Sequence, residues 1–430
     1  MNLIGPLSLV DSVEDFGTTE LYAATASVVT EINGTVYVFV AGYYDGGIQV
    51  LRLEGEDLVP VHSFSDNDSV GLYGPTSLQI VDTGAERYLV VLSPGEDAIT
   101  SFRIDQTAGA TEGQLFAADM LSSNGNGGTV PDFDSAAQQA QATTSGGHFV
   151  ITAGNYSDSV NVFRIGTDGR FTLVDTVLDS EAPDLNLNGA TSVAVHQSGA
   201  NTFVFVGSDT YDNGISVFSM SAAGVLTTVQ NIDVNAVDTY STVADMTVVA
   251  ANGRNYLVAC DTYEDMLHVY QIAANGALTE VSSLATNVYG TAIDYNNIAR
   301  LDTMIVNGVA FVVASSSYDD AVVVFGLDQN GILDKVQDLA LPELSGVAGV
   351  TAFFHNGRQY ILGAAESNSR ITLLEVGGGA DPLVATTGAD RIVGLGGDDD
   401  LVALGGHDTV FGGAGDDVLS GRGGNDVLDG

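Results

Sequence analysis

Short apolar segments of similar sequence recur along the first 376 residues of the chain. In phrases such as "SVNVFRI" (159–165) and "GISVFSM" (214–220), apolar and polar residues alternate. Alternation over about four to eight residues predicts a half-buried β-strand, because successive strand side chains point to opposite faces. The large apolar position of this phrase is found at Leu51, Phe102, Phe163, Phe218, Tyr270, Phe325 and Leu374.

Further strands are predicted on both sides of each phrase. A hairpin precedes it, often with an Asn-Gly turn, as in "EINGTVYVFV" (31–40) and "FFHNGRQYIL" (353–362). Asn-Gly between β-branched and aromatic residues is a strong hairpin signal, because both turn residues accept a positive φ. A second turn and a fourth apolar run follow the phrase, as in "TDGRFTLV" (167–174). Each unit therefore predicts four antiparallel strands.

Seven four-stranded units with a period of roughly fifty residues predict an all-β fold, a seven-bladed β-propeller over residues 1–376. The seventh unit has three strands up to Val376 and no fourth strand before the glycines begin. We expect the apolar segment "NLIGPLSLV" (2–10) to supply that strand, because the pairing would close the ring and cover two open strand edges. An open array of β-sandwich units is the alternative.

The extended repeat carries a family resemblance. Its pattern V-x-V-F-x-I followed by x-G-x-L-x-x-V, as in "SVNVFRIGTDGRFTLV" (159–174), resembles the seven-bladed 6-phosphogluconolactonase-like (lactonase) propeller family. The resemblance covers roughly residues 1–376 and rests on scaffold positions, so it implies the fold more than an activity. Enzymes of this type use polar and basic residues, His and Arg among them, at the channel mouth. In this chain the pattern places Arg300 there and no histidine.

From residue 386 the period falls to nine residues. The units "GADRI", "GDDDL", "GHDTV", "GDDVL" and "GNDVL" follow one another without a register slip. Glycine permits tight turns with inward carbonyls, and aspartate offers the hard oxygen that Ca²⁺ prefers. The candidate metal ligands are Asp390, Asp399, Asp408, Asp417 and Asp426.

This shorter pattern resembles the RTX (hemolysin-type) calcium-binding nonapeptide repeat. The resemblance implies a C-terminal parallel β-roll with two nonapeptides per turn, in which calcium binding and folding are coupled. We assign residues 377–385 to a Gly-rich linker and residues 386–430 to the roll. The stop at Gly430, the first residue of a sixth unit, predicts that further repeats follow. A flexible Gly/Asp linker is the alternative reading of the tail.

The charge and the targeting signals of the chain limit the kinds of partner and the location that we expect. The 55 acidic and 12 basic residues give a formal charge of −43, which repels phosphate backbones and anionic lipids. We therefore expect calcium ions as partners but no nucleic acid and no membrane insertion, and a saline medium is an alternative cause of the acidity. No Sec-type signal or transmembrane helix is predicted. The RTX resemblance implies a protein secreted from Gram-negative cells through a type I channel, and the lone Cys260 allows no intramolecular disulfide.

Tyrosine and acidic residues recur in the turns between the second and third strands of the units. In a propeller these turns share one face around the mouth of the central channel. Tyrosine combines an apolar ring with a hydroxyl group, which suits a carbohydrate, a lactone or a cell-surface ligand. Ordinary turn chemistry is the alternative. The candidate ligand-binding residues are Tyr44, Tyr156, Tyr211, Tyr263 and Tyr318.

Two aspartates are candidates for chemistry at the channel mouth. Alignment of the hairpins places Asp245 ("VADMTVV") and Asp302 ("RLDTMIV") near the start of the inner strands of neighbouring blades. Two such carboxylates could hold a cation or act as an acid/base pair. The alternative is that both accept hydrogen bonds from backbone amides, with Arg300 neutralising their charge.

Three functions remain open on the sequence. The first is a secreted calcium-binding protein whose Tyr-rich, acidic propeller face binds a ligand or a surface partner. The second is a secreted lactonase-like hydrolase that uses Asp245 and Asp302. The third is a structural or surface-layer component. Whether the protein is an enzyme is left undecided by the residues alone.

Overall fold

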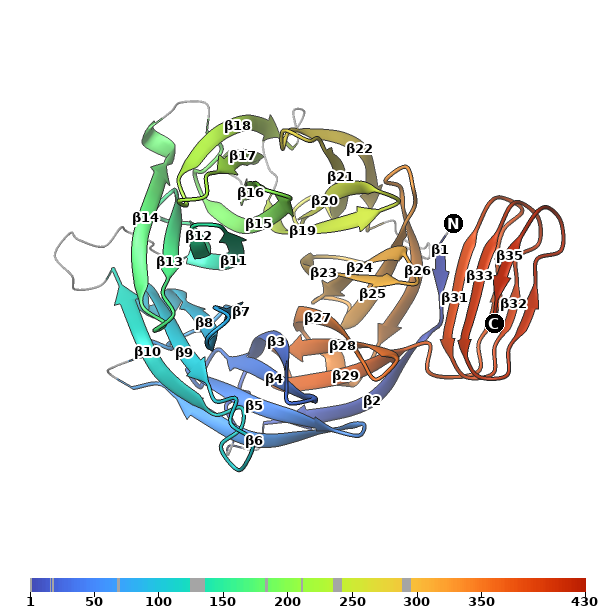
Figure 1. The fold of residues 1–430 in the computed structure, drawn as a ribbon, viewed down its shortest axis with the longest axis horizontal. Coiled ribbons are helices and arrows are strands. Elements are labelled where there is room, and N and C mark those ends of the chain that lie inside the picture. Colours follow the sequence, from blue (N-terminus) through green and yellow to red (C-terminus); the bar gives the residue numbers. More distant parts are fainter. Residues whose placement is uncertain are drawn as a thin grey trace.

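The computed structural model describes residues 2–15, 17, 19–67, 70–123, 136–181, 185–209, 212–234, 242–287 and 295–430. Seven antiparallel four-stranded sheets are arranged as blades around a central channel, with a smaller parallel assembly beside them (Figure 1). The fold confirms the predicted all-β class and the seven-bladed propeller. No helix of the described residues is long and apolar enough to cross a membrane.

Each blade is an up-and-down meander whose strands pair in sequence order. Blades 1 to 3 are β3–β6 (Ala24–Ile32, Thr35–Gly42, Gly47–Glu54, Asp57–Ser65), β7–β10 (Ser77–Asp82, Arg87–Ser93, Ala98–Ile104, Leu115–Ser122) and β11–β14 (Ala136–Thr144, Gly147–Gly154, Ser159–Ile165, Phe171–Leu178). Blades 4 to 6 are β15–β18 (Ala190–Ser198, Asn201–Ser208, Gly214–Met220, Leu226–Asp233), β19–β22 (Val243–Ala251, Arg254–Asp261, Met266–Ile272, Leu278–Ala285) and β23–β26 (Ile298–Val306, Val309–Ser316, Ala321–Leu327, Leu333–Ala340).

The Asn-Gly turns of the inner hairpins adopt the backbone that their sequence predicts. In the turn between β3 and β4, φ is 49° at Asn33 and 82° at Gly34. Positive φ at both central residues gives the twist that matches the two flanking strands. The pairs Asn252-Gly253, Asn307-Gly308 and Asn356-Gly357 repeat this conformation.

The ring closes through the N-terminal segment. Blade 7 consists of β27 (Val347–His355), β28 (Arg358–Ala365) and β29 (Arg370–Val376), and its fourth strand is β2 (Leu7–Glu14), antiparallel to β29. Closure by an N-terminal strand is therefore confirmed, but the expected span of 2–10 is wrong at both ends. The short strand β1 (Asn2–Ile4) does not belong to the blade, because it pairs with the C-terminal assembly.

Apolar side chains fill the spaces between neighbouring blades. Each of the seven blade-to-blade interfaces has its own cluster, with ten to eighteen buried apolar residues among those the structure describes. A buried Phe or Tyr from the repeated phrase lies in most of these clusters, for example Phe102, Phe163 and Phe218. The extended repeat thus specifies a ring of similar interfaces.

The C-terminal assembly is a parallel β-roll of two small sheets. One sheet contains β1, β31 (Arg391–Gly396), β33 (Thr409–Ala414) and β35 (Val427–Asp429). The other contains β30 (Pro382–Val384), β32 (Asp400–Val402) and β34 (Val418–Ser420). The expectation of a linker over 377–385 is wrong at β30, which pairs with β32 as a rung of the roll. The core between the sheets is thin, with five buried apolar residues.

Candidate functional site

The nonapeptide aspartates of the roll lie one above another at a spacing of eighteen residues. In Asp399, Asp408, Asp417 and Asp426, one carboxylate oxygen, Oδ1, accepts a hydrogen bond from the backbone N–H of the aspartate one turn earlier. For example, Asp381 N donates to Asp399 Oδ1 at 2.8 Å, and Asp399 N donates to Asp417 Oδ1 at 3.0 Å. On the other side of the roll, Asp390 N donates to Asp408 Oδ1, and Asp408 N donates to Asp426 Oδ1. The stacking of turns thus fixes one oxygen of each carboxylate.

The second oxygen of four aspartates is buried and has no protein partner. These atoms are the Oδ2 atoms of Asp381, Asp399, Asp408 and Asp417. A buried carboxylate oxygen without a donor costs free energy unless a cation or water meets it. Burial and, to a lesser extent, the neighbouring charge of Asp399 together raise the pKa of Asp381 to about 6. Hard anionic oxygens in this state fit Ca²⁺.

Carbonyl groups would have to complete any such site. Among the described residues, no three His, Cys, Asp or Glu side chains are grouped so that they could share one ion. Ca²⁺ takes about six to eight oxygen ligands, including backbone carbonyls. The glycine-rich turns bring carbonyls close to the carboxylates: a Cβ on Gly394 would lie closer than 3.0 Å to both Asp399 Oδ2 and the carbonyl oxygen of Gly412.

Two aspartates named from the sequence differ from this arrangement. Both carboxylate oxygens of Asp390 accept hydrogen bonds from Thr386, which donates from its N–H to Oδ2 at 2.8 Å and from its hydroxyl to either oxygen. Asp426 belongs to the last rung and is partly exposed. These two carboxylates therefore have less need of a cation to neutralise a buried, unpartnered oxygen than Asp399, Asp408 and Asp417.

Sequence reasoning missed Asp381. The residue is only 3% exposed, and its Oδ2 atom belongs to the same unpartnered series. A signal for it exists, because Gly379, Asp381 and Leu383 precede Gly388, Asp390 and Ile392 by nine residues. The proline that follows Asp381 obscured the register.

A polar cavity of about 390 Å³ lies within the ring of inner strands. Its lining includes Ser27, Ser77, Gln138, Asp245 and Arg300. Arg300 Nη1 donates to the carbonyls of Ala299 and Ala244, at 3.1 and 3.4 Å, and so is held near the wall. Arg300 is accordingly a cationic group that could meet an anionic ligand in the cavity.

Asp245 and Asp302 lie on neighbouring inner strands, as expected, and both bridge one blade to the next. Asp245 Oδ2 accepts the N–H of Leu301 at 2.7 Å, and its Oδ1 accepts from Met246 N and Gln138 Nε2. Burial raises the pKa of Asp245, while the charge of Arg300 opposes that rise.

Asp302 repeats this bridge one blade further on. Its Oδ2 accepts the N–H of Ala352 at 2.8 Å, and its Oδ1 accepts that of Thr303 at 2.7 Å. Burial raises the pKa of Asp302 to about 6. Asp302 does not line the cavity. The geometry of both carboxylates favours the scaffold role over acid/base chemistry, because their oxygens are already occupied.

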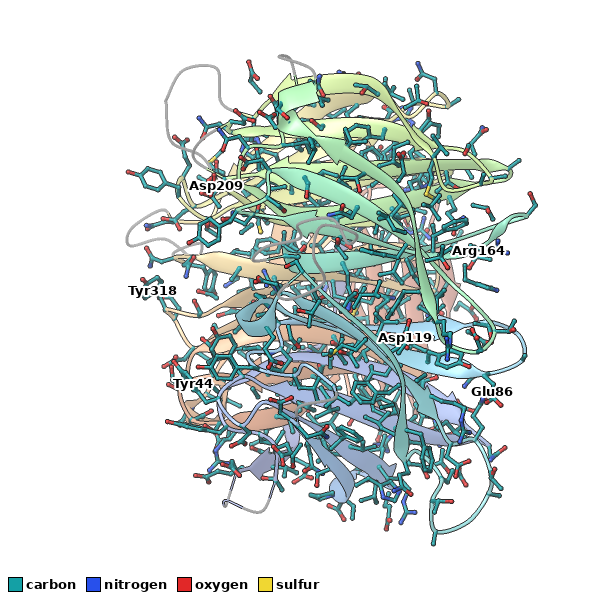
Figure 2. All side chains as sticks on the ribbon, turned by 90° about the vertical axis from the view of Figure 1, so that its left-hand side faces the viewer. Tyr44, Glu86, Asp119, Arg164, Asp209 and Tyr318 are labelled. Carbon is teal, nitrogen blue, oxygen red and sulfur yellow. The ribbon has the colours of Figure 1, made fainter. Side chains whose placement is uncertain are left out.

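The tyrosine-bearing turns lie on one face of the ring. Tyr44 and Tyr318 project from the same side as Asp209, opposite Glu86 and Arg164 (Figure 2). The exposed fraction is 63% for Tyr44 and 77% for Tyr318, and Tyr156 and Tyr263 are similarly exposed. Tyr211 lies outside the described residues.

The acidic residues of the same turns are engaged in the scaffold. Asp319 Oδ2 accepts the N–H of Asn296 within its own blade, and Asp320 Oδ1 accepts that of Gly346 in the next blade. Asp212 and Asp265 make equivalent contacts. The alternative of turn chemistry therefore explains these aspartates, whereas the tyrosine side chains of the same turns are largely exposed.

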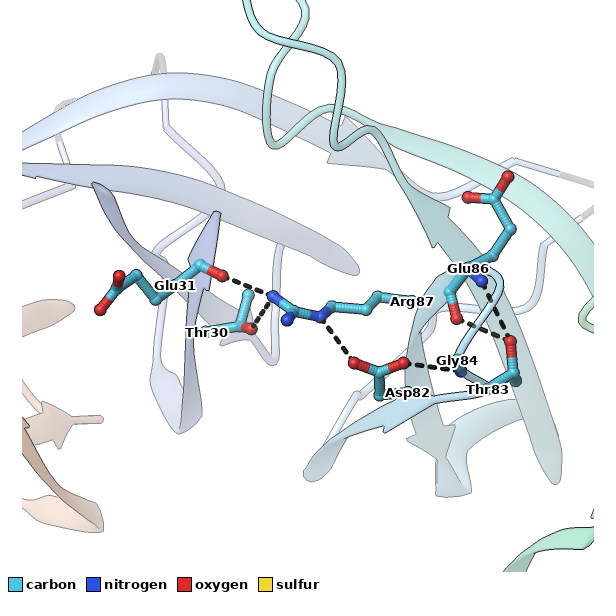
Figure 3. Close-up of polar contacts among 7 residues, drawn as sticks. All are labelled: Thr30, Glu31, Asp82, Thr83, Gly84, Glu86 and Arg87. Carbon is cyan, nitrogen blue, oxygen red and sulfur yellow. Dashed lines mark hydrogen bonds and ion pairs between the residues drawn. The ribbon is translucent and has the colours of Figure 1, made fainter. Parts of the chain in front are cut away.

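A different polar link joins blades 1 and 2 at the hairpin turn between β7 and β8 (Figure 3). Arg87 donates from Nε to Asp82 Oδ2 at 3.0 Å, and from Nη1 to Thr30 Oγ1 at 3.2 Å and to the carbonyl of Glu31 at 2.5 Å. The N–H of Gly84 and the charge of Arg87 hold the pKa of Asp82 below its usual range. This arginine is thus committed to the scaffold.

Comparisons with known proteins agree with both parts of the chain. The family model "Lactonase, 7-bladed beta-propeller" matches residues 13–252, which is more than half of the chain. The RTX calcium-binding nonapeptide repeat matches residues 375–410 and 402–430. No curated protein matches the chain.

Solved structures share the fold at low sequence identity. A Lactobacillus plantarum protein is 17% identical, with a TM-score of 0.54, over 74% of this chain and 86% of that one. A candidate 6-phosphogluconolactonase from Bacteroides fragilis is 17% identical, with a TM-score of 0.53, over 82% and 89%. A protein of unknown function from Desulfotomaculum acetoxidans is 13% identical, with a TM-score of 0.53, over 80% and 98%. At such identities the likeness shows the fold alone.

Proposed function

The chain belongs to the seven-bladed β-propeller lactonase family, and we propose that it is a secreted calcium-binding protein whose propeller binds a ligand through its tyrosine-bearing face. In this proposal the roll folds on calcium after export. The observation that carries it is the series of buried, unpartnered Oδ2 atoms at Asp381, Asp399, Asp408 and Asp417. Bound calcium would supply the positive charge that these oxygens lack.

The charge of the aspartates makes folding of the roll depend on calcium in this proposal. Without a cation, carboxylates stacked at one-turn spacing repel one another, and the five-residue core is too small to offset that cost. Binding of the ion and ordering of the turns are then one equilibrium. RTX repeats are typical of proteins that leave the cell through type I secretion, and an unfolded roll before export suits that route.

Calcium titration of the full chain tests this part of the proposal. We expect circular dichroism to report added β-structure as calcium rises into the millimolar range, which is typical of extracellular calcium modules. The double variant Asp399→Asn and Asp417→Asn should require at least about 10-fold more calcium, because two ligand charges are removed. A spectrum that stays constant from chelator to excess calcium would exclude a calcium-folded roll.

The tyrosine face is the part of the propeller proposed to meet a ligand. Exposed tyrosine rings can stack on sugar rings while their hydroxyl groups donate and accept hydrogen bonds. A glycan array with the wild-type chain, followed by Tyr156→Ala and Tyr318→Ala, tests this. Phe354→Ala is the matched control, because Phe354 is a similarly exposed aromatic residue (64%) on an inner strand. Equal binding by all three variants would remove the tyrosine face from the proposal.

Hydrolysis of a lactone at the channel mouth is the second candidate function. The observation that favours it is the polar cavity lined by both Arg300 and Asp245. Arg300 is the group placed to stabilise a developing negative charge there. A lactone screen in the presence of calcium, repeated with Arg300→Ala, tests the idea. Absence of turnover, or turnover that is unchanged in Arg300→Ala, would count against it.

A further inference from the structure

The N-terminal strand occupies the position of a missing rung of the roll. β1 is parallel to β31 and pairs Leu3 with Ile392, just as β31 pairs Ile392 with Val410 in β33. The four-residue sequences at these equivalent positions are similar, each with an aliphatic second residue and a final glycine: "NLIG" (2–5), "RIVG" (391–394), "TVFG" (409–412) and "VLDG" (427–430). Residues 2–5 therefore act as a rung supplied from the other end of the chain (Figure 1).

The repeat itself could not supply this rung. Eighteen residues before β31 the chain reaches residues 373–378, and residues 373–376 belong to β29 in blade 7 of the propeller. The rung position nearest the propeller would thus be empty. An exposed parallel edge at that point would be open to pairing with other chains, and β1 covers it.

Gly5 reproduces the surroundings of a glycine within the repeat. A Cβ on Gly5 would lie closer than 3.0 Å to Asp381 Oδ2 and to the carbonyl oxygen of Gly394. A Cβ on Gly394 would meet the equivalent pair, Asp399 Oδ2 and the carbonyl oxygen of Gly412. The unpartnered Oδ2 of Asp381 is therefore enclosed by the same kind of backbone as that of Asp399, with residue 5 in place of a repeat glycine.

The same segment is anchored to the propeller. Asn2 Nδ2 donates to the carbonyl of Leu327 at 2.5 Å, and Gln337 Nε2 donates to the carbonyl of Ile4 at 3.0 Å. Ile4 is fully buried in the apolar cluster between blades 6 and 7, together with Val393 of the roll. The carbonyl of Pro6 accepts the N–H of Gly377, and β2 begins one residue later.

We propose that residues 2–5 and the turn at 377–381 complete the calcium site at Asp381, and that calcium bound there fastens the strand that closes the propeller. The site would take a divalent cation with the Asp381 carboxylate and nearby backbone carbonyls as ligands. The proposal rests on the proposed calcium binding of the roll and extends it to the propeller. Because β1 continues through Gly5 and Pro6 into β2, an ion held at Asp381 stabilises the ring closure as well as the roll.

Hydrogen exchange of the full chain, read by mass spectrometry in calcium and in chelator, tests the coupling. Amides of residues 2–14 and 370–376 should exchange about 100-fold more slowly at a free calcium concentration 100 times the dissociation constant. Amides of β12 in blade 3 should not change. Asp381→Asn should abolish the effect on residues 2–14, whereas Asp426→Asn, the same substitution at the far end of the roll, should leave it intact.

Ion counting by native mass spectrometry gives a second readout. Asp381→Asn and Gly5→Ala should each bind one calcium ion fewer than the wild type. Gly379→Ala, in the same turn, is the control, because a Cβ there meets nothing within 4 Å. Calcium protection of the roll without protection of residues 2–14, or equal behaviour of Asp381→Asn and Asp426→Asn, would overturn the coupling alone. No calcium effect on the roll at all would overturn the proposed function as well.

Discussion

Aspartate has two different roles in the propeller and in the roll. In the propeller, both carboxylate oxygens of Asp302 accept backbone N–H groups, one of them from the next blade. In the roll, Asp399 accepts one N–H through Oδ1, and its buried Oδ2 receives none. The residue type is the same, so the difference lies in how many donors the surrounding chain brings to it. A satisfied carboxylate supports the scaffold, whereas a half-satisfied one is available to a cation.

The apolar cores of the two regions also differ, in the number of buried residues that stabilise them. Each blade-to-blade interface has at least ten buried apolar residues, while the core between the two sheets of the roll has five among the described residues. Apolar burial is the main stabilising term of a folded domain. The propeller can therefore fold by packing alone, and the roll depends on something that neutralises its aspartates.

Removal of calcium should give the largest difference in hydrogen-exchange rate between the roll and the propeller. In chelator we expect amides of residues 381–430 to exchange more than about 100-fold faster, because the thin core cannot offset carboxylate repulsion. Strands within the blades, such as β12 and β13, should keep their protection. Hydrogen exchange by mass spectrometry measures both in one sample. A roll that stays protected in chelator would show that five buried residues suffice.

Removing one aspartate from each region should show the two roles directly, beginning with the propeller. Asp302→Ala leaves the N–H groups of Thr303 and Ala352, which lie in partly buried strands, without their acceptor, which should lower the free energy of unfolding of the propeller by roughly 2–4 kcal/mol. Urea unfolding in chelator measures this effect. Calcium affinity should be unchanged.

The reciprocal variant, Asp399→Asn, should have the opposite profile. We expect weaker calcium binding and an unchanged urea midpoint of the propeller in chelator. If Asp399→Asn lowered that midpoint as much as Asp302→Ala, the distinction between the two kinds of aspartate would be lost.

Acid should stabilise the propeller. Burial raises the pKa of Asp302 from its ordinary value of 3.8 to about 6 in the folded chain. The folded state therefore binds the Asp302 proton more tightly than the unfolded state. The stabilisation that this proton contributes is fully present below about pH 4 and is lost as pH rises through 6. We expect a gain of roughly 1–3 kcal/mol on going from pH 7 to pH 4 in chelator. Asp302→Asn, which cannot titrate, should show a correspondingly smaller gain in urea unfolding experiments.

The smallest effect should distinguish aspartates within the roll. Asp390→Asn removes a carboxylate that already accepts hydrogen bonds from Thr386, whereas Asp408→Asn removes one with a buried, unpartnered oxygen. We expect Asp408→Asn to weaken calcium binding about 10-fold and Asp390→Asn to weaken it less. Isothermal titration of the two variants provides the comparison. A larger loss in Asp390→Asn would mean that Thr386 does not compete for that carboxylate.

The local pattern predicted most of the architecture. Alternating apolar residues and Asn-Gly turns specified the strands of the blades, as the turn at Asn33 and Gly34 shows. The nine-residue register specified the stacking of Asp399 on Asp417. Prediction failed where the pattern is short or interrupted: Pro382 masked the rung at β30, and three residues of β1 carry too little periodicity to choose a partner.

The sequence by itself determined two periods, and with them a ring of blades followed by a stack of turns, because strand alternation and turn glycines act between near neighbours in the chain. Only the tertiary structure decided where residues 2–5 pair and which aspartates remain unsatisfied. The first depends on a strand almost four hundred residues further along the chain, which meets Leu3 at Ile392. The second depends on groups on other turns or blades, such as the N–H of Asp381 that reaches Asp399 from 18 residues away. The N–H of Ala352, which completes Asp302, likewise comes from another blade. A residue's type states what it can bind, and the surrounding fold decides whether that capacity is already used.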